Sequence, residues 1–193
     1  MKLNLPNKLT VARIIATPVF MLFLTWDFKG HYILALILFI AASLTDMFDG
    51  QYARKHNMVT DFGKFLDPLA DKMLTTAAFI GFAAKGIGNG IAWILFIVLF
   101  REFLISSLRL VAVSSGGKVI AANIWGKLKT VSQMVAIIYI MTAEIAIEIF
   151  KIDLLTNILH SITDIVLWIS AILTVVSGAI YLFDNKDVIN PNK

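Results

Sequence analysis

The chain contains no cysteine among its 193 residues. It therefore cannot form a disulfide, use a thiolate nucleophile or bind a metal ion through thiolates. Charge is also scarce, because Asp, Glu, Lys and Arg make up 16% of the residues, whereas about one residue in four is charged in soluble domains. Hydrophobic residues make up 59% and the mean hydropathy is +0.82. This composition predicts a polytopic, all-α membrane protein.

Six apolar stretches are candidates for membrane helices, since a spanning helix needs roughly 20 mostly apolar residues. They are Thr10–Trp26, Tyr32–Met47, Phe62–Ala84, Ile91–Ser114, Leu128–Phe150 and Ile158–Phe183. The second stretch reaches the required length only when its polar end is included. Because only short polar segments separate the stretches, we expect one membrane domain, residues 1–193, built as a bundle of six transmembrane helices.

Lysine and arginine are distributed unevenly between the two ends of such a bundle. If the N-terminus is cytoplasmic, three of them fall in outer segments, at Lys29, Lys85 and Lys151. Twelve fall in inner segments: Lys2, Lys8, Arg13, Arg54, Lys55, Lys64, Arg109, Lys118, Lys127, Lys129, Lys186 and Lys193. This bias is typical of the positive-inside rule. We expect a multi-pass protein of the cell (inner) membrane with both termini cytoplasmic. Its net charge of +4 then suits membrane lipids with anionic headgroups, and no nucleic acid is expected as a partner.

Aspartates gather between the second and third apolar stretches. Asp46 and Asp49 are three residues apart, and Asp67 and Asp71 are four apart, so each pair shares one face of a helix. The short connection from residue 54 to residue 63 predicts that the two helices are antiparallel neighbours. Four carboxylates would then converge at the cytoplasmic end. Asp61 lies off this face and is more simply a helix cap or a solvated charge.

Four carboxylates beside lipid need compensating positive charge, which divalent metal ions can supply. An all-oxygen ligand set favours Mg²⁺ or Mn²⁺, with Ca²⁺ less favoured, and could hold two ions about 4 Å apart. Gly50 and Ala53 leave room beside the second helix, as Gly63 does beside the third. The guanidinium of Arg54 suits phosphate oxygens. The pattern therefore predicts a metal-dependent site for phosphoryl transfer.

This spacing resembles the signature of the CDP-alcohol phosphotransferase family at all eight positions. They are Asp46, Asp49, Gly50, Ala53, Arg54, Gly63, Asp67 and Asp71. The resemblance implies six membrane helices, an active site at the cytoplasmic side and a homodimer. It also implies that the four aspartates bind the metal ions, that Asp71 is in addition the catalytic base, and that Gly50, Ala53, Arg54 and Gly63 line the site for the CDP-lipid.

Four further segments resemble members of the family that use sn-glycerol 3-phosphate as acceptor. They are LPNKLTVARIIATP (5–18), DFGKFLDPLADK (61–72), REFLISSLR (101–109) and WGKLKTVSQ (125–133). The implied reaction transfers the phosphatidyl group of CDP-diacylglycerol to this acceptor, releases CMP and supplies the precursor of phosphatidylglycerol and cardiolipin. No nucleophilic Ser, Cys or His is evident, so we expect direct displacement. The acceptor phosphate needs a basic partner, and Arg109, Lys127 and Lys129 are the candidates, although these residues could instead only fix topology and bind lipid.

Two alternatives stay open. The same chemistry could use inositol phosphate, serine or phosphatidylglycerol as acceptor, or the acidic cluster could belong to a divalent-cation transporter. Arg101 and Glu102 lie nearer the middle of the fourth stretch, where charged residues are usually functional or paired. We expect these two to pair with other helices rather than with each other and to order the pocket. For Glu144 and Glu148, near the outer end, we expect solvation at the membrane interface.

Overall fold

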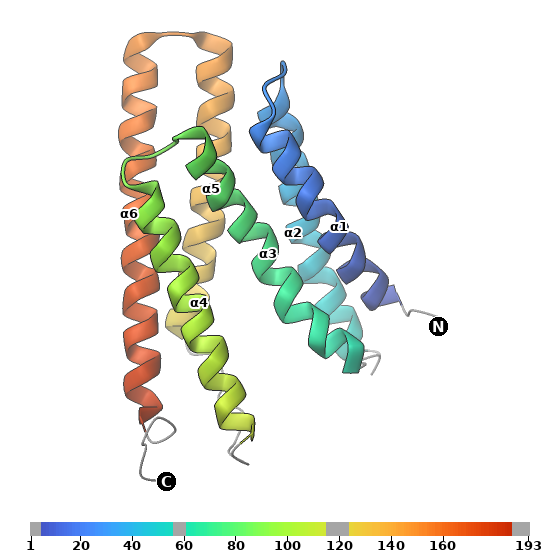
Figure 1. The fold of residues 1–193 in the computed structure, drawn as a ribbon. Helices are drawn as coiled ribbons and strands as arrows, with labels where there is room; N and C mark the ends of the chain where they lie inside the picture. Colours follow the sequence, from blue (N-terminus) through green and yellow to red (C-terminus); the bar gives the residue numbers. More distant parts are fainter. Residues whose placement is uncertain (1–4, 56–60, 115–123, 187–193) are drawn as a thin grey trace.

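The computed structural model describes residues 5–55, 61–114 and 124–186 of the chain (Figure 1). Within these ranges, side chains are described except at residues 5–6, 46–55, 61–65, 67–68, 71 and 113–114. The described residues form six α-helices and no strand: α1 (Leu5–Thr25), α2 (His31–Lys55), α3 (Asp61–Lys85), α4 (Ile91–Ser114), α5 (Ile124–Phe150) and α6 (Asp153–Asp184). The all-α fold predicted from the sequence is therefore confirmed.

Four of these helices contain segments long and apolar enough to cross a membrane. The segments are Asn7–Thr25, Ile91–Ala112, Ile124–Phe150 and Asp153–Asp184. The apolar part of α2 is shorter, His31–Thr45, because its last turns carry aspartates and basic residues. The first turns of α3 are similarly charged. The membrane character of the chain is thus supported, and the count of six spans stays a prediction.

Three short connections lie at one end of the bundle, which we call the connecting end: residues 26–30, 86–90 and 151–152. The opposite end, where α2 finishes at Lys55 and α3 begins at Asp61, is the signature end (Figure 1). Gly88 shows why the second connection needs glycine. Its φ is +92°, and a Cβ there would lie 2.3 Å from Cδ1 of Leu167. A larger residue would therefore be strained and would also push the connection away from α6.

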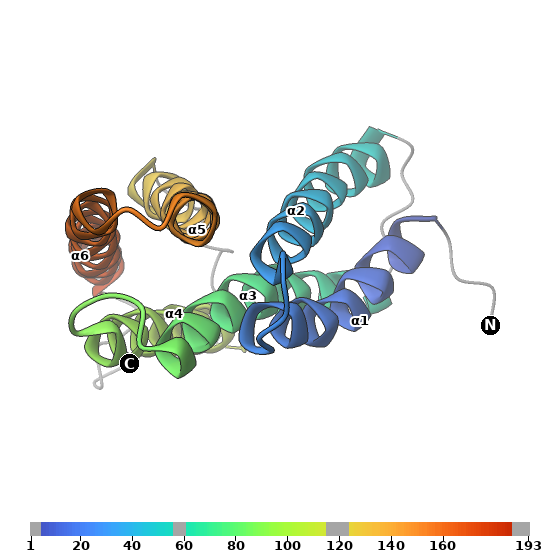
Figure 2. The same ribbon diagram turned by 90° about the horizontal axis from the view of Figure 1, so that it is seen from above.

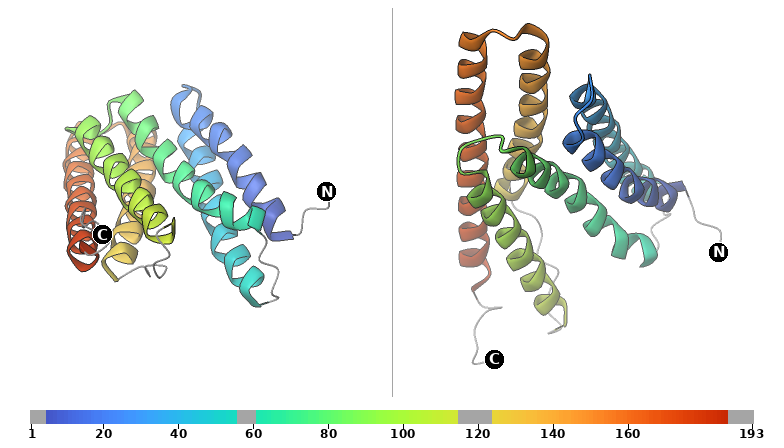
Figure 3. Two further views of the ribbon diagram at one scale, coloured as in Figure 1. Left: turned by 60° about the horizontal axis from the view of Figure 1, so that its bottom comes forward. Right: turned by 45° about the horizontal axis from the view of Figure 1, so that its top comes forward.

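The helix α3 lies between the α1–α2 pair and the group formed by α4, α5 and α6 (Figures 2 and 3). It approaches α1 closely because Gly81 has no side chain, and a Cβ there would lie 2.3 Å from Cδ2 of Leu24. The helices α1 and α2 pack against each other through the buried rings of Phe20 and Phe39, whose centroids are 5.7 Å apart.

The helices α2 and α3 run antiparallel, as predicted (Figure 1). In the part of the chain that the structure describes, each of them packs mainly against α1.

Candidate active site at the signature end

The eight signature residues lie on α2 and α3, next to the signature end. The helix bounds carry α2 through Asp46 and Asp49 and α3 through Asp67 and Asp71, so each pair has helical spacing. The side chains of all eight fall outside those described, namely Asp46, Asp49, Gly50, Ala53, Arg54, Gly63, Asp67 and Asp71. Their convergence, metal binding and contact with the CDP-lipid therefore stay predictions.

A pocket of about 550 Å³ opens between α3, α4 and α5, toward the signature end. We call it the cation pocket because five basic side chains line it: Lys72, Arg101, Arg109, Lys127 and Lys129. Lys72 directly follows the signature residue Asp71 on α3. The pocket is therefore continuous with the helix that carries half of the signature carboxylates.

All three residues predicted to bind the acceptor phosphate line this pocket. Arg109 comes from α4, whereas Lys127 and Lys129 come from the first turns of α5. The structure thus brings together residues that are 20 positions apart in the sequence. The sequence prediction of the acceptor site did not include Lys72 or Arg101. Two features of the sequence could have indicated them: Lys72 is next to Asp71, and Arg101 is a charged residue within an apolar stretch.

Glu102 of α4 is the acidic centre of this pocket. Its Oε2 lies 3.2 Å from Nζ of Lys72, and its Oε1 lies 3.1 Å from Nη1 of Arg101. Nζ of Lys129 donates a hydrogen bond to the same Oε1. Lys129 is buried, and the Glu102 side chain is 12% exposed. Three helices therefore contribute cations to one largely buried carboxylate.

The prediction for Arg101 and Glu102 was partly wrong. Glu102 does pair with α3 and α5, through Lys72 and Lys129, as expected. Arg101 nevertheless pairs with Glu102 itself. Neighbouring residues point about 100° apart on a helix, but the long arginine side chain spans this angle.

An apolar groove of about 430 Å³ adjoins the cation pocket between α3 and α4. Its apolar walls include Leu69, Met73 and Phe103, and it shares Lys72 and Glu102 with the cation pocket. Leu69 and Phe103 are exposed on the outside of the described bundle. The cation pocket and the apolar groove therefore meet at the same two residues.

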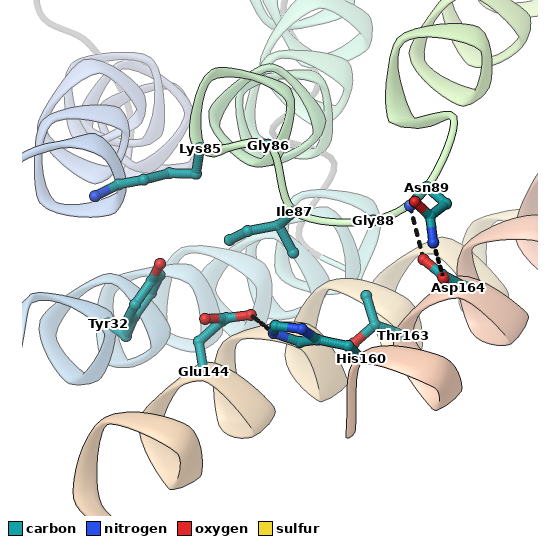
Figure 4. A pocket seen from close by; sticks show the side chains of 10 residues that line it. All are labelled: Tyr32, Lys85, Gly86, Ile87, Gly88, Asn89, Glu144, His160, Thr163 and Asp164. Atoms are coloured by element: carbon teal, nitrogen blue, oxygen red, sulfur yellow. Dashed lines mark hydrogen bonds and ion pairs between the residues drawn. The ribbon is translucent and has the colours of Figure 1, made fainter. Parts of the chain in front are cut away.

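A second polar pocket, of about 300 Å³, lies at the connecting end (Figure 4). Asp164 of α6 accepts hydrogen bonds from the backbone N of Asn89 at 2.7 Å and from its Nδ2 at 2.6 Å. Oε1 of Glu144 lies 3.5 Å from Nε2 of His160, which ties α5 to α6. These contacts hold the 86–90 connection against α6 and hold α5 against α6. The pocket lies at the end opposite the signature end.

Two predictions concerned acidic residues near this pocket. Glu144 was expected to be solvated, but its side chain is only 11% exposed and faces His160. Glu148 accepts a hydrogen bond from the backbone N of Gly30 at 3.3 Å. Both carboxylates thus contribute to the packing of the connecting end. Close by, the hydrogen bond and charge of Lys85 lower the pKa of Asp27 from its ordinary value.

Comparison with known proteins gives a consistent result. The model of the CDP-alcohol phosphatidyltransferase family matches residues 3–176. A CDP-diacylglycerol–glycerol-3-phosphate 3-phosphatidyltransferase of Bacillus subtilis (strain 168) is 38% identical over 198 residues, covering 96% of this chain and 97% of that protein. The protein of that name from Rickettsia bellii (strain RML369-C) is 40% identical over 182 residues, covering 92% and 93%. A probable phosphatidylglycerophosphate synthase of Mycobacterium tuberculosis (strain ATCC 25618 / H37Rv) is 37% identical over 183 residues, covering 93% and 80%.

Proposed function

The chain belongs to the CDP-alcohol phosphatidyltransferase family, and we propose that it transfers the phosphatidyl group of CDP-diacylglycerol to sn-glycerol 3-phosphate. The products are CMP and phosphatidylglycerophosphate, the precursor of phosphatidylglycerol and cardiolipin. Relatives that carry the name of this activity align with more than nine tenths of the chain. The observation that carries the proposal is the cation pocket beside signature helix α3, since it suits an acceptor that has its own phosphate.

Enzymes of this family generally depend on divalent cations. Asp46 and Asp49 on α2, with Asp67 and Asp71 on α3, form an all-oxygen donor set, which fits Mg²⁺ or Mn²⁺ better than Ca²⁺. We propose that these four residues hold two such ions. When bound, the ions would neutralise the diphosphate oxygens and the charge of the departing CMP.

The donor lipid would bind between the signature helices and the membrane. Gly50, Ala53 and Gly63 leave room for the cytidine diphosphate, and Arg54 offers donors to its oxygens. The apolar groove between α3 and α4 suits an acyl chain, because it opens on exposed apolar residues and reaches the cation pocket. This arrangement would let the diphosphate meet a water-soluble acceptor while the lipid tails stay in the membrane.

The reaction is a single displacement. Asp71 accepts the proton of the acceptor hydroxyl as the oxygen attacks the β-phosphorus. A bond forms between this oxygen and phosphorus, while the bond from phosphorus to the CMP oxygen breaks and CMP takes the electron pair. Direct attack inverts the configuration at phosphorus. Lys72 follows Asp71 in the chain and lines the cation pocket, which supports a base and an acceptor site on one stretch of α3.

The charges of the pocket favour a dianionic acceptor. Its described lining carries five basic side chains and one carboxylate, which leaves an excess of positive charge for a phosphate. Arg109, Lys127 and Lys129 are the proposed phosphate ligands. Serine lacks this phosphate and would leave the excess charge unmatched. Inositol phosphate also carries one, so charge alone does not separate it from glycerol 3-phosphate.

We further propose that the protein is a homodimer in the cell membrane, with the signature end and both termini in the cytoplasm. The distribution of lysine and arginine along the sequence supports this orientation. It would place the cation pocket where glycerol 3-phosphate and CMP can exchange with the cytosol.

An acceptor screen tests the proposed function. The purified protein is incubated with CDP-diacylglycerol and either Mg²⁺ or Mn²⁺, and CMP release is measured with glycerol 3-phosphate, inositol phosphate, serine or phosphatidylglycerol. We expect release with glycerol 3-phosphate. Release with inositol phosphate instead would change the acceptor and keep the chemistry. Uptake of Mg²⁺ into proteoliposomes without any CMP release would favour a transporter.

A further inference from the structure

Glu102 is the one acidic residue among the described side chains that line the cation pocket. Its two oxygens are divided between the surrounding cations. Oε1 contacts Arg101 and Lys129, whereas Oε2 contacts Lys72. One carboxylate therefore fixes the relative positions of charges from α3, α4 and α5.

Arg101 and Lys129 need the carboxylate of Glu102 because both are largely buried. Lys129 is only 5% exposed, and an unpaired charge in such surroundings is costly. Without Glu102, three like charges would face one another across a small space. Arg101 could not turn away easily, because its stem is packed against α6, where a Cβ at Gly178 would lie 3.2 Å from its Cγ.

Lys72 is the most exposed of the three cations that contact Glu102. It is 40% exposed, and Ser106 accepts a further hydrogen bond from it. An ammonium group on a flexible four-carbon stem has many alternative positions. Glu102 and Ser106 restrict it to the wall shared by the cation pocket and the apolar groove.

We propose that Glu102 is a positioning residue for the acceptor. It holds the three cations that contact it in a fixed arrangement, and through them it sets the affinity of the cation pocket for a phosphate monoester. This proposal rests on the proposed function. Glu102 acts through its neighbours and makes no contact with the substrate itself.

The sign of the effect separates positioning from simple electrostatics. Glu102→Gln removes a negative charge, so an effect of net charge alone would strengthen phosphate binding and lower the KM for glycerol 3-phosphate. Loss of positioning would instead raise this KM, by about thirtyfold or more if the cost resembles that of breaking a buried ion pair. The KM for CDP-diacylglycerol should change less than about twofold.

The experiment compares Glu102→Gln and Glu102→Asp with the wild-type protein in CMP-release assays, varying one substrate at a time. Glu102→Asp keeps the charge and should restore part of the affinity for glycerol 3-phosphate. Glu148→Gln, the same substitution at the connecting end, is the matched control. A second readout is inhibition by inorganic phosphate, which should weaken in Glu102→Gln in proportion to the KM.

Two results would overturn the proposal: a KM for glycerol 3-phosphate that is unchanged or lower in Glu102→Gln, or an equal rise for both substrates. If Glu102→Gln does not fold, Ser106→Ala decides, because it removes one of the two contacts that hold Lys72 without removing charge and should raise the KM for glycerol 3-phosphate alone. The proposed function fails separately, if the wild-type protein does not use glycerol 3-phosphate at all.

Discussion

The guanidinium group of Arg109 on α4 lies over the ring of Tyr181 on α6, with its Cζ 5.5 Å from the ring centroid. Its Nε also donates a hydrogen bond to the Tyr181 hydroxyl at 3.2 Å. Tyr181 is buried, whereas Arg109 is exposed and lines the cation pocket. A fixed residue of α6 thus sets the direction of a proposed phosphate ligand.

Substitution of Tyr181 should weaken acceptor binding in two steps. Tyr181→Phe keeps the ring and loses the hydrogen bond, so we expect the KM for glycerol 3-phosphate to rise about threefold. Tyr181→Leu also loses the ring, and the rise should reach about tenfold. Tyr139→Phe is the control, because its hydroxyl donates to the carbonyl of Leu159, away from the cation pocket. Equal kinetics for wild type and Tyr181→Leu would exclude this role for Tyr181.

Arg109→Ala should affect one substrate much more than the other. Loss of a charged phosphate ligand is expected to raise the KM for glycerol 3-phosphate at least about tenfold. The KM for CDP-diacylglycerol should stay close to the wild-type value. Arg109→Lys keeps the charge but loses the planar guanidinium group, so its KM for glycerol 3-phosphate should lie between those of the wild type and Arg109→Ala. A similar rise for both substrates would remove Arg109 from the acceptor site.

Asp71→Asn should abolish turnover, because an amide cannot take up the proton of the acceptor hydroxyl. Binding of CDP-diacylglycerol should stay measurable, since three signature aspartates are retained. Asp61→Asn is the matched control, as Asp61 lies outside the signature spacing. Steady-state CMP release and direct binding of the labelled lipid measure the two effects. Turnover near the wild-type rate in Asp71→Asn would refute its assignment as base.

The connecting end should contribute to stability and not to substrate affinity. Asp164→Ala removes both hydrogen bonds with Asn89, and we expect a loss of about 1–2 kcal/mol in the free energy of unfolding, since the pair is exposed. Asn89→Ala removes only the side-chain bond and should cost less. Thermal unfolding in detergent ranks the variants by stability. The KM values for glycerol 3-phosphate and CDP-diacylglycerol should match those of the wild type. Unchanged unfolding in Asp164→Ala would show that the pair is not structural.

Much of the fold follows from the sequence because apolar runs decide where helices can cross a membrane. The bounds differ where polar residues continue a helix. The second apolar stretch ends near Met47, but α2 continues to Lys55, as the helical spacing of Asp46 and Asp49 indicates, since hydropathy falls before the backbone leaves the helix. The last helix begins earlier than expected, at Asp153, whose carboxylate is favourable in a first turn.

The candidate site was predictable only where its residues are close in the sequence. The spacing of Asp46, Asp49, Asp67 and Asp71 is visible along two helices. The contact of Lys72 with Glu102 is not, because the two residues are 30 positions apart and meet only through the packing of α3 on α4. No periodicity within one helix encodes such a pair.

The central claim is that the signature aspartates bind divalent ions beside a pocket for the acceptor phosphate. The most direct test is CMP release from CDP-diacylglycerol and glycerol 3-phosphate by the purified protein, first in excess chelator and then after addition of Mg²⁺ or Mn²⁺. We expect no release in chelator and full recovery when the ion is restored. Release in chelator at the rate seen with Mg²⁺ would contradict the claim.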